Sequence, residues 1–216
     1  MLDINLFNRQ RRTLLAIDFD DVLFDCNDAL QRIIRNEFHD TSPYMEFIGK
    51  HPQLKNEIFR FLYGSYHQDS TMIDGAYDVL SQLAKNHQMV VVTGRSESTR
   101  RQTEKWLGNN FPTLFSGIYF ANTIHRRKNE SERKKSNICL DIGVDILIDD
   151  SVEEAIEVSS VGVTVLLFDR SWNRTVVSDS LFRVNSWSHV LDKLSNTGGK
   201  SCNLNRNPAW IRTRRL

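Results

Sequence analysis

The chain has 216 residues, with 28 basic and 27 acidic side chains and a formal net charge of +1. This length suits one α/β domain with an insertion. The near-balance of charge excludes the strong positive field that attracts nucleic-acid polymers. Since no apolar run approaches the ~20 residues that a membrane-spanning helix needs, we expect neither nucleic acid nor membrane as a partner.

The cysteines bear on the cellular compartment. They are odd in number, widely spaced and without the spacing of metal ligands: Cys26, Cys139 and Cys202. This pattern indicates reduced thiols, and the N-terminus lacks the apolar run of a secretory signal, so we expect a cytoplasmic protein. Arg9, Arg11 and Arg12 near the N-terminus keep organelle targeting open as an alternative. The oligomeric state also stays open, with a homodimer as one alternative.

Short apolar runs alternate with segments of helical periodicity along the chain. The runs are LLAIDF (14–19), MVVVTG (89–94), GIYFA (117–121), DILIDD (145–150) and VTVLLF (163–168). Such runs are typical of strands in a parallel sheet, because helices cover both faces of that sheet and bury every strand residue. The order of the elements predicts an α/β fold with a Rossmann-like parallel sheet flanked by helices.

The first strand and the next core helix, near Gly75, are separated by roughly fifty residues, whereas connections in α/β units usually have ~2–6. Residues 28–39 and 52–68 of this stretch have the periodicity of amphipathic helices. An insertion after the first strand lies at the carboxyl edge of the sheet, where ligands bind in such folds. We therefore predict an α/β core of residues 1–26 and 74–195, a helical cap of 27–73 and a flexible basic tail of 196–216.

Polar side chains follow three of the predicted strands. They are Asp18, Asp20 and Asp21; Thr93, Gly94 and Arg95; and Asp149 and Asp150. Because the strands end at one sheet edge, the acids converge there and repel one another unless a cation lies among them. Ligation by oxygen alone suits Mg²⁺, and no His or Cys cluster offers a zinc site. The pattern favours magnesium-dependent phosphoryl transfer.

Phosphoryl transfer gives each of these types of side chain a task. A carboxylate can attack phosphorus and form an aspartyl-phosphate, and a second one can protonate the leaving alkoxide and later deprotonate water. A hydroxyl, an ammonium group and the metal can balance the charge on the phosphoryl oxygens. For Arg95 we consider two alternatives, binding of a substrate phosphate and pairing with a surface acid.

Four short segments, DFDDV, VVVTGR, a following lysine and LIDD, resemble the signature segments of the haloacid dehalogenase superfamily of phosphatases. Within that superfamily, WLGNNFPTLFSGIYFAN, KSNICLDIGVDILIDDS and VLLFDRSWNR are similar to the 5′(3′)-deoxyribonucleotidase family and its nucleotidase-like relatives. The resemblance covers most of residues 13–175, and the cap matches only loosely.

The resemblance implies roles for four acids. Asp18 is expected to be the nucleophile and a Mg²⁺ ligand. Asp20 is expected to act as general acid and base and to bind the metal through its main-chain carbonyl. Asp149 is expected to be the third metal ligand, and Asp150 to lie behind these ligands.

The same resemblance implies that Thr93 and Gly94 bind the phosphate and that a lysine neutralises its charge. Lys135 is preferred to its neighbour Lys134 for this role, because it opens the family-like segment KSNIC. Many relatives have glycine where this chain has Asp21. Aspartate tolerates turn conformations less well than glycine and adds a negative charge, which casts doubt on the efficiency of catalysis.

The expected substrate is a phosphate monoester, and the resemblance implies a (deoxy)nucleoside monophosphate. A small sugar or organic phosphate is one alternative, and a catalytically weak phosphate-binding regulatory protein is another. The aromatic residues of the cap suit stacking on a base or, as the favoured interpretation, the apolar face of a helical insert: Tyr44, Phe47, Phe61, Tyr63 and Tyr66. Trp172 and Arg174 are expected to pack and anchor a loop, and Cys26 is not expected to be a catalytic thiol.

Overall fold

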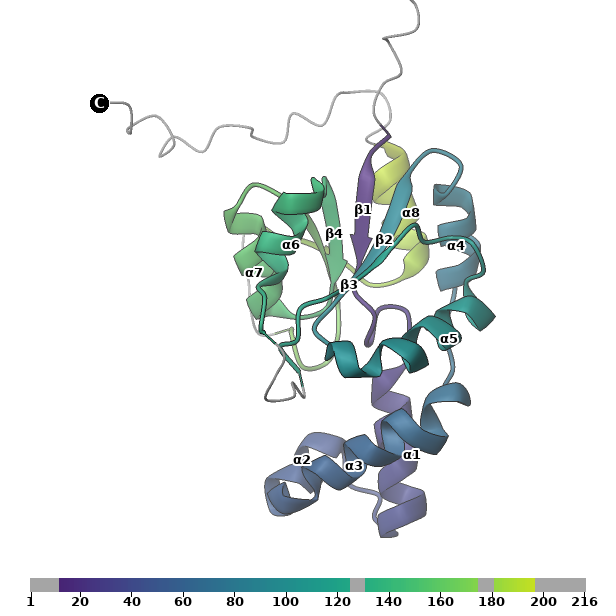
Figure 1. Ribbon diagram of the computed structural model, residues 1–216, viewed down its shortest axis with the longest axis vertical. Helices are drawn as coiled ribbons and strands as arrows, with labels where there is room; N and C mark the ends of the chain where they lie inside the picture. Colours follow the sequence, from purple (N-terminus) through teal and green to yellow (C-terminus); the bar gives the residue numbers. More distant parts are fainter. Residues whose placement is uncertain (1–11, 125–130, 175–180, 197–216) are drawn as a thin grey trace, which may run out of the picture.

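The computed structural model describes residues 12–124, 131–174 and 181–196. At its centre lies a six-stranded sheet in the order β3-β2-β1-β4-β5-β6, with every neighbouring pair parallel (Figure 1). The strands are β1 (Leu14–Ile17), β2 (Gln88–Thr93), β3 (Ile118–Phe120), β4 (Ile146–Asp149), β5 (Thr164–Phe168) and β6 (Phe182–Val184). The predicted parallel α/β fold is confirmed. The arginines Arg9 and Arg11 and the tail from residue 197 lie outside the described residues.

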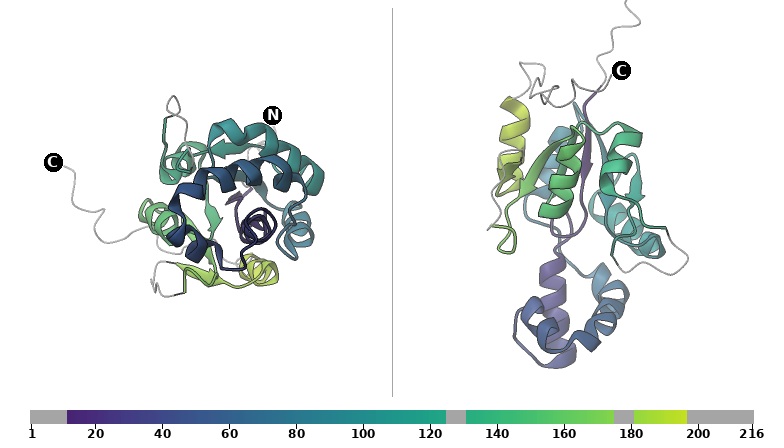
Figure 2. Two further views of the ribbon diagram at one scale, coloured as in Figure 1. Left: turned by 90° about the horizontal axis from the view of Figure 1, so that it is seen from below. Right: turned by 90° about the vertical axis from the view of Figure 1, so that its left-hand side faces the viewer.

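Helices lie on both faces of the sheet (Figures 1 and 2). They are α4 (Ala76–Leu83), α5 (Arg100–Asn110), α6 (Lys135–Ile142), α7 (Val152–Ser160) and α8 (Trp187–Asn196). Alternate residues of β1 point to opposite faces, so Leu15 and Ile17 pack in the cluster of α4 and α8, and Leu14 and Ala16 in that of α6 and α7. None of the helices in the described ranges combines the length and apolar character needed to cross a membrane.

A cap of helices lies between β1 and β2 in the chain and sits beyond the carboxyl ends of the strands, at the bottom of Figure 1. Its elements are α1 (Cys26–Phe38), α2 (Tyr44–Lys50), η2 (Pro52–Leu54), α3 (Lys55–Phe61) and η3 (Leu62–Tyr66). Ile33, Phe47, Ile58 and Leu62 are buried inside the cap and belong to the same apolar cluster as one face of the sheet. The predicted helical cap is therefore confirmed, and it packs continuously against the core.

Two connectors join the cap to the core, and they are hydrogen-bonded to each other. The amide of Asp25 donates to the carbonyl of Thr71 at 3.0 Å, and the amide of Ile73 donates to the carbonyl of Leu23 at 2.8 Å. Phe24 forms an antiparallel bridge between these bonds. The chain thus enters and leaves the cap through one paired segment.

Candidate active site

Acidic side chains from two adjacent strands meet at the carboxyl edge of the sheet. Asp18 follows β1 and Asp149 ends β4, and the amide of Asp18 donates to the carbonyl of Ile148 at 2.9 Å. One carboxylate oxygen each from Asp18, Asp149 and Asp150 lie within 4.8 Å of one another. Three oxygens at these separations match the needs of a cation with oxygen ligands.

Lys135, the first residue of α6, places its ammonium group among three carboxylates. Its Nζ lies 2.7 Å from Oδ1 of Asp18, 2.7 Å from Oδ2 of Asp149 and 2.5 Å from Oε2 of Glu154. The side chain is buried, whereas Lys134, the preceding residue, is exposed. The structure therefore brings Lys135, and not Lys134, into contact with Asp18.

Glu154 is a member of this site that the sequence motifs do not reveal. Ser151 caps the N-terminus of α7, and its hydroxyl accepts a bond from the amide of Glu154 at 3.3 Å. In a capping box the glutamate would reach back to the amide of the capping serine. Here the amide of Ser151 donates to Asp149 Oδ1 at 2.9 Å, and the carboxylate of Glu154 turns to Lys135 instead. The Ser-x-x-Glu spacing predicts that Glu154 lies in the first turn of a helix, but it does not predict the contact with Lys135.

The charges of the site favour a divalent cation. Burial raises the pKa of Asp18 well above its usual value, and the charge of Asp149 adds to this, although Lys135 opposes it. Burial and Asp149 likewise raise the pKa of Asp150 to about 7. The donor set consists of carboxylate oxygens, which is the chemistry that Mg²⁺ prefers. Asp18, Asp149 and Asp150 would hold the ion, so Asp150 lies among the candidate ligands and not only behind them.

Asp20 directs its carboxylate to Arg95. Nε of Arg95 donates to Oδ2 at 2.8 Å and Nη2 donates to Oδ1 at 2.6 Å. Burial tends to raise the pKa of Asp20, but the charge and hydrogen bonds of Arg95 outweigh it and lower this pKa. Of the two alternatives for Arg95, the structure shows pairing with an acid, but the arginine is fully buried and the acid is Asp20 of the site and not a residue of the outer surface.

Thr93 and Gly94 follow one another at the end of β2. Thr93 is fully buried, and its hydroxyl oxygen accepts a bond from the amide of Arg95 at 3.2 Å, which leaves the hydroxyl proton to donate elsewhere. Gly94 lines the cavity described below. A Cβ at this position would lie 2.7 Å from Oγ1 of Thr123 and 3.1 Å from Cδ1 of Ile124, so close packing requires glycine here.

Asp21 adopts the left-handed conformation that glycine would adopt, with a φ of 56°. Its Oδ1 accepts a bond from the amide of Asn27 in the first turn of α1 at 2.9 Å. Its carbonyl accepts a bond from Nε of Arg170 at 3.0 Å. Burial, followed by the charge of Asp150, raises the pKa of Asp21 to about 8. Asp21 thus gives the cap helix a hydrogen-bond acceptor that glycine lacks.

A cavity of about 630 Å³ lies over these residues and is lined by Asp18, Asp20 and Lys135 of the core and by Phe59 and Tyr63 of the cap. Of the five cap aromatics considered above, Tyr63 lines this cavity. The others pack inside or along the cap, as Phe47 does against Phe38 at 5.4 Å between ring centroids. The structure supports the packing interpretation for most of the set, and it adds Phe59 to the aromatic residues that line the cavity.

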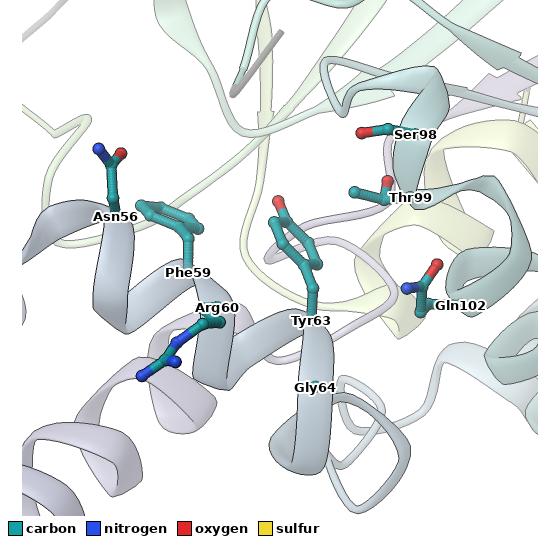
Figure 3. Close-up of a pocket in the computed structure, with 8 residues that line it drawn as sticks. All are labelled: Asn56, Phe59, Arg60, Tyr63, Gly64, Ser98, Thr99 and Gln102. Carbon is teal, nitrogen blue, oxygen red and sulfur yellow. The ribbon is translucent and has the colours of Figure 1, made fainter. Parts of the chain in front are cut away.

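A second hollow of about 490 Å³ adjoins the first, since Phe59 and Tyr63 line both. Figure 3 shows Asn56, Phe59 and Tyr63 on one side of the cap helix, pointing toward the core, while Ser98, Thr99 and Gln102 lie across the gap. The two rings therefore lie between the cavity over the acidic site and the second hollow between cap and core.

Trp172 does not pack as expected. Its side chain is 48% exposed, it lines the cavity, and its indole Nε1 donates to Oδ2 of Asp150 at 3.0 Å. The buried Asn173 anchors this loop instead, because its Nδ2 donates at 2.8 Å to the carbonyls of Phe168 and Asp150. Cys26 is buried, and burial raises the pKa of its thiol, which agrees with a thiol that is not a nucleophile.

Comparisons with known proteins show the family to which the chain is similar. The family model described as "5′ nucleotidase, deoxy (Pyrimidine), cytosolic type C protein" matches residues 12–197. A curated nucleotidase of Clostridium acetobutylicum is 22% identical over 187 residues, which cover 82% of this chain and 90% of that relative.

Solved structures show the same fold. The HAD-hydrolase YfnB of Bacillus subtilis, described as bound to magnesium, is similar with a TM-score of 0.59 and 16% identity. The alignment covers 86% of this chain and 100% of the YfnB chain. CbbY of Rhodobacter sphaeroides, described as in complex with phosphate, has a TM-score of 0.58 and 13% identity, over 82% of this chain and 96% of its own. Because the family model spans nearly the whole described chain, the protein belongs to the cytosolic type C 5′-deoxynucleotidase family.

Proposed function

We propose that this protein hydrolyses 5′-(deoxy)nucleoside monophosphates, with Asp18 as the nucleophile. The observation that carries the proposal is the position of the Asp18 carboxylate, which lines the cavity, contacts Lys135 and lies among the candidate metal ligands. The family description names a deoxynucleotidase of the cytosol, in agreement with the compartment expected from the cysteines. The curated relative is also named a nucleotidase.

In the first half-reaction Asp18 attacks the phosphorus atom, and the bond from phosphorus to the ester oxygen breaks. Asp20 gives a proton to the departing nucleoside alkoxide, while Lys135 and the hydroxyl of Thr93 balance the charge on the phosphoryl oxygens. Because Arg95 lowers the pKa of Asp20, only a small fraction of the molecules carries this proton near neutral pH. When bound, Mg²⁺ supplies positive charge that reduces the repulsion between the carboxylate and the phosphate. In the second half-reaction water attacks the phosphorus atom of the aspartyl-phosphate, and Asp20 takes a proton from that water. The bond between phosphorus and the Asp18 oxygen breaks, which restores the carboxylate and releases inorganic phosphate.

We assign the nucleoside part of the substrate to the side of the cavity that Phe59 and Tyr63 form. Their rings lie 6.0 Å apart between centroids and face the acidic site from the cap. Aromatic side chains bind flat, partly polar rings well, and the hollow behind them gives room for a base. A small sugar phosphate would leave this apolar surface uncovered.

The test uses purified protein with Mg²⁺ and a panel of nucleoside monophosphates and sugar phosphates, with release of inorganic phosphate as the readout. Nucleotides should be turned over in preference to sugar phosphates, and Asp18→Asn should abolish turnover. Asp78→Asn, at an exposed position of α4, is the matched control and should retain it.

Each hypothesis has an outcome that contradicts it. Preference for sugar phosphates would replace the proposed substrate, and robust turnover by Asp18→Asn would refute the nucleophile. Magnesium-dependent phosphate binding without any turnover would favour the regulatory alternative.

A further inference from the structure

Arg95 is a fully buried arginine between the acidic site and the cap. Its two bonds to Asp20, of 2.8 and 2.6 Å, run from two different nitrogens to the two carboxylate oxygens. Paired bonds of this kind fix the plane of the carboxylate, because the guanidinium group is itself planar. The remaining lone pairs of Asp20 then point in fixed directions, and with them the path along which this acid can exchange a proton.

The other side of the guanidinium group contacts the cap. Nη1 donates to Nε2 of His67 at 2.6 Å and to Oγ1 of Thr103 in α5 at 3.3 Å. His67 follows η3, is fully buried and must accept this bond, since a guanidinium group can only donate. Burial and the charge of Arg95 lower the pKa of His67 to about 3, so the ring remains a neutral acceptor.

Three aromatic rings enclose the same group. Cζ of Arg95 lies 4.2 Å from the ring centroid of Phe19, 4.9 Å from that of Phe24 and 5.1 Å from that of Tyr63. Phe19 and Phe24 belong to the connector that enters the cap, and Tyr63 belongs to the cap itself. A cation over aromatic faces is attracted to them, so the connector and the cap both help to fix the place of this arginine.

We propose that Arg95 is a positioning residue for Asp20 and that His67 fixes Arg95 in turn, so that the seating of the cap sets the orientation of the acid. The inference deepens the proposed function and rests on it, because Arg95 acts here only through the proton transfer by Asp20. The geometry gives Arg95 one partner in the site, one in α5 and one in the cap, which is what such a link requires.

The test compares Arg95→Lys with Arg100→Lys. Lysine keeps the charge but cannot make the paired bonds. Arg100 is a matched control, because it pairs with Glu97 and Glu104 at the surface. Each variant is assayed with a nucleoside monophosphate, whose leaving alkoxide needs a proton, and with an activated phosphate (p-nitrophenyl or acetyl phosphate), whose leaving group does not.

For Arg95→Lys we expect kcat/KM with the nucleotide to fall by ~10²-fold, the lower end of a general acid contribution, and kcat/KM with the activated phosphate to change little. This ratio reports the first half-reaction and not the hydrolysis of the aspartyl-phosphate, which both substrates share and in which Asp20 also takes part. The KM for the nucleotide and the inhibition by inorganic phosphate should stay near those of the wild type. Arg100→Lys should behave as the wild type with both substrates. A purely structural role of Arg95 would instead lower both activities in the same proportion.

The link to the cap is tested with His67→Gln and His67→Leu. The amide oxygen of glutamine can accept the bond from Arg95, whereas leucine has no acceptor. We expect His67→Leu to show the same selective loss with the nucleotide, and His67→Gln to restore most of it. Thermal unfolding of each variant shows whether it is folded. If Arg95→Lys does not fold, the comparison of His67→Gln with His67→Leu tests the proposal in its place.

Equal losses with both substrates, or equal behaviour of His67→Gln and His67→Leu, would overturn the inference while leaving the proposed function intact. A wild-type protein that hydrolyses neither substrate would overturn the proposed function, and the inference with it. The two failures are thus distinguished by the wild-type assay alone.

Discussion

Glu154 places its Oε2 2.5 Å from Nζ of Lys135, away from the start of its own helix. This contact gives the lysine a third acidic partner that is not among the three carboxylates grouped for a cation. Glu154 therefore orients Lys135 while Asp18 and Asp149 remain available to metal and substrate. The loss of such a supporting contact typically reduces activity by ~10–100-fold.

We accordingly expect Glu154→Gln to lower turnover by ~10-fold or more, because the lysine loses a charged partner but the shape of the site is kept. Steady-state kinetics at saturating Mg²⁺ measure this. Glu153→Gln, at the exposed neighbouring position of the same helix, is the control and should retain activity. Equal losses in both variants would show that the charge of the helix terminus matters, and not the contact with Lys135.

Lys135→Met should leave the buried acids without their ammonium partner. Breaking a buried ion pair in this way typically costs ~3–5 kcal/mol. Loss of a group that balances transition-state charge should also lower turnover by ~10²-fold or more. Urea unfolding and phosphate release measure the two effects. The exposed Lys134→Met should show neither, and a similar result for both lysines would contradict the assignment.

The metal-free protein should lose stability as pH rises. The folded pKa values of Asp150, about 7, and Asp21, about 8, lie above the ~3.9 of an unfolded aspartate. Between these values the folded protein binds more protons than the unfolded chain, so its stability is highest below the unfolded pKa and falls as pH rises through the folded ones. The unfolding temperature in chelator should therefore be lower at about pH 8 than at about pH 5.

Mg²⁺ should raise the unfolding temperature more at about pH 8 than at about pH 5, because it binds the ionised carboxylates. Differential scanning fluorimetry with and without the ion measures this difference. An equal shift at both pH values would mean that the ion binds elsewhere.

Asp21→Ala should destabilise the fold by ~1–3 kcal/mol, because alanine in the left-handed conformation is strained and offers no acceptor to the amide of Asn27. Asp21→Asn keeps the acceptor, tolerates this conformation and removes a half-buried charge, so it should be at least as stable as the wild type. Urea unfolding above the folded pKa of Asp21 measures both variants. A stable alanine variant would refute the role assigned to the side chain.

Phe59→Leu should raise KM for nucleoside monophosphates and leave inhibition by inorganic phosphate unchanged, because the ring lines the cavity on the side that we assign to the nucleoside. Phe61→Leu, two residues on, changes a ring that packs against Phe38 at 6.3 Å and is the control. Its KM should stay near that of the wild type. A rise in KM for both variants would indicate a general loosening of the cap.

The sequence predicts the sheet well where strands are buried runs of aliphatic residues, and less well elsewhere. Strand β6 (Phe182–Val184) has three residues and buries only Val184, so its sequence lacks an apolar run. Helix α2 (Tyr44–Lys50) follows Pro43 without a side-chain cap, and its seven residues are too short a stretch to establish a helical period. Both depend on tertiary contacts more than on local pattern.

At the site, the motifs place Asp18, Lys135 and Asp149 because strand ends and helix starts have fixed positions in this fold. They do not predict the pairing of Arg95 with Asp20 or the turn of Glu154 toward Lys135. Long side chains can reach partners on several elements, and which one they choose depends on burial and on the charges of the completed site. The partners of such side chains therefore cannot be predicted from the periodicity of the sequence.

The hydrogen-bonded connectors have a consequence for modular exchange of the cap. Since the amide of Ile73 donates a hydrogen bond of 2.8 Å to the carbonyl of Leu23, the two junctions of the insert lie next to each other in space. A chimera that joins at these two residues can receive the cap of another family member without altering the separation of the ends it must bridge. These two neighbouring residues are therefore suitable junctions for a chimera that changes the substrate preference while the catalytic core stays unchanged.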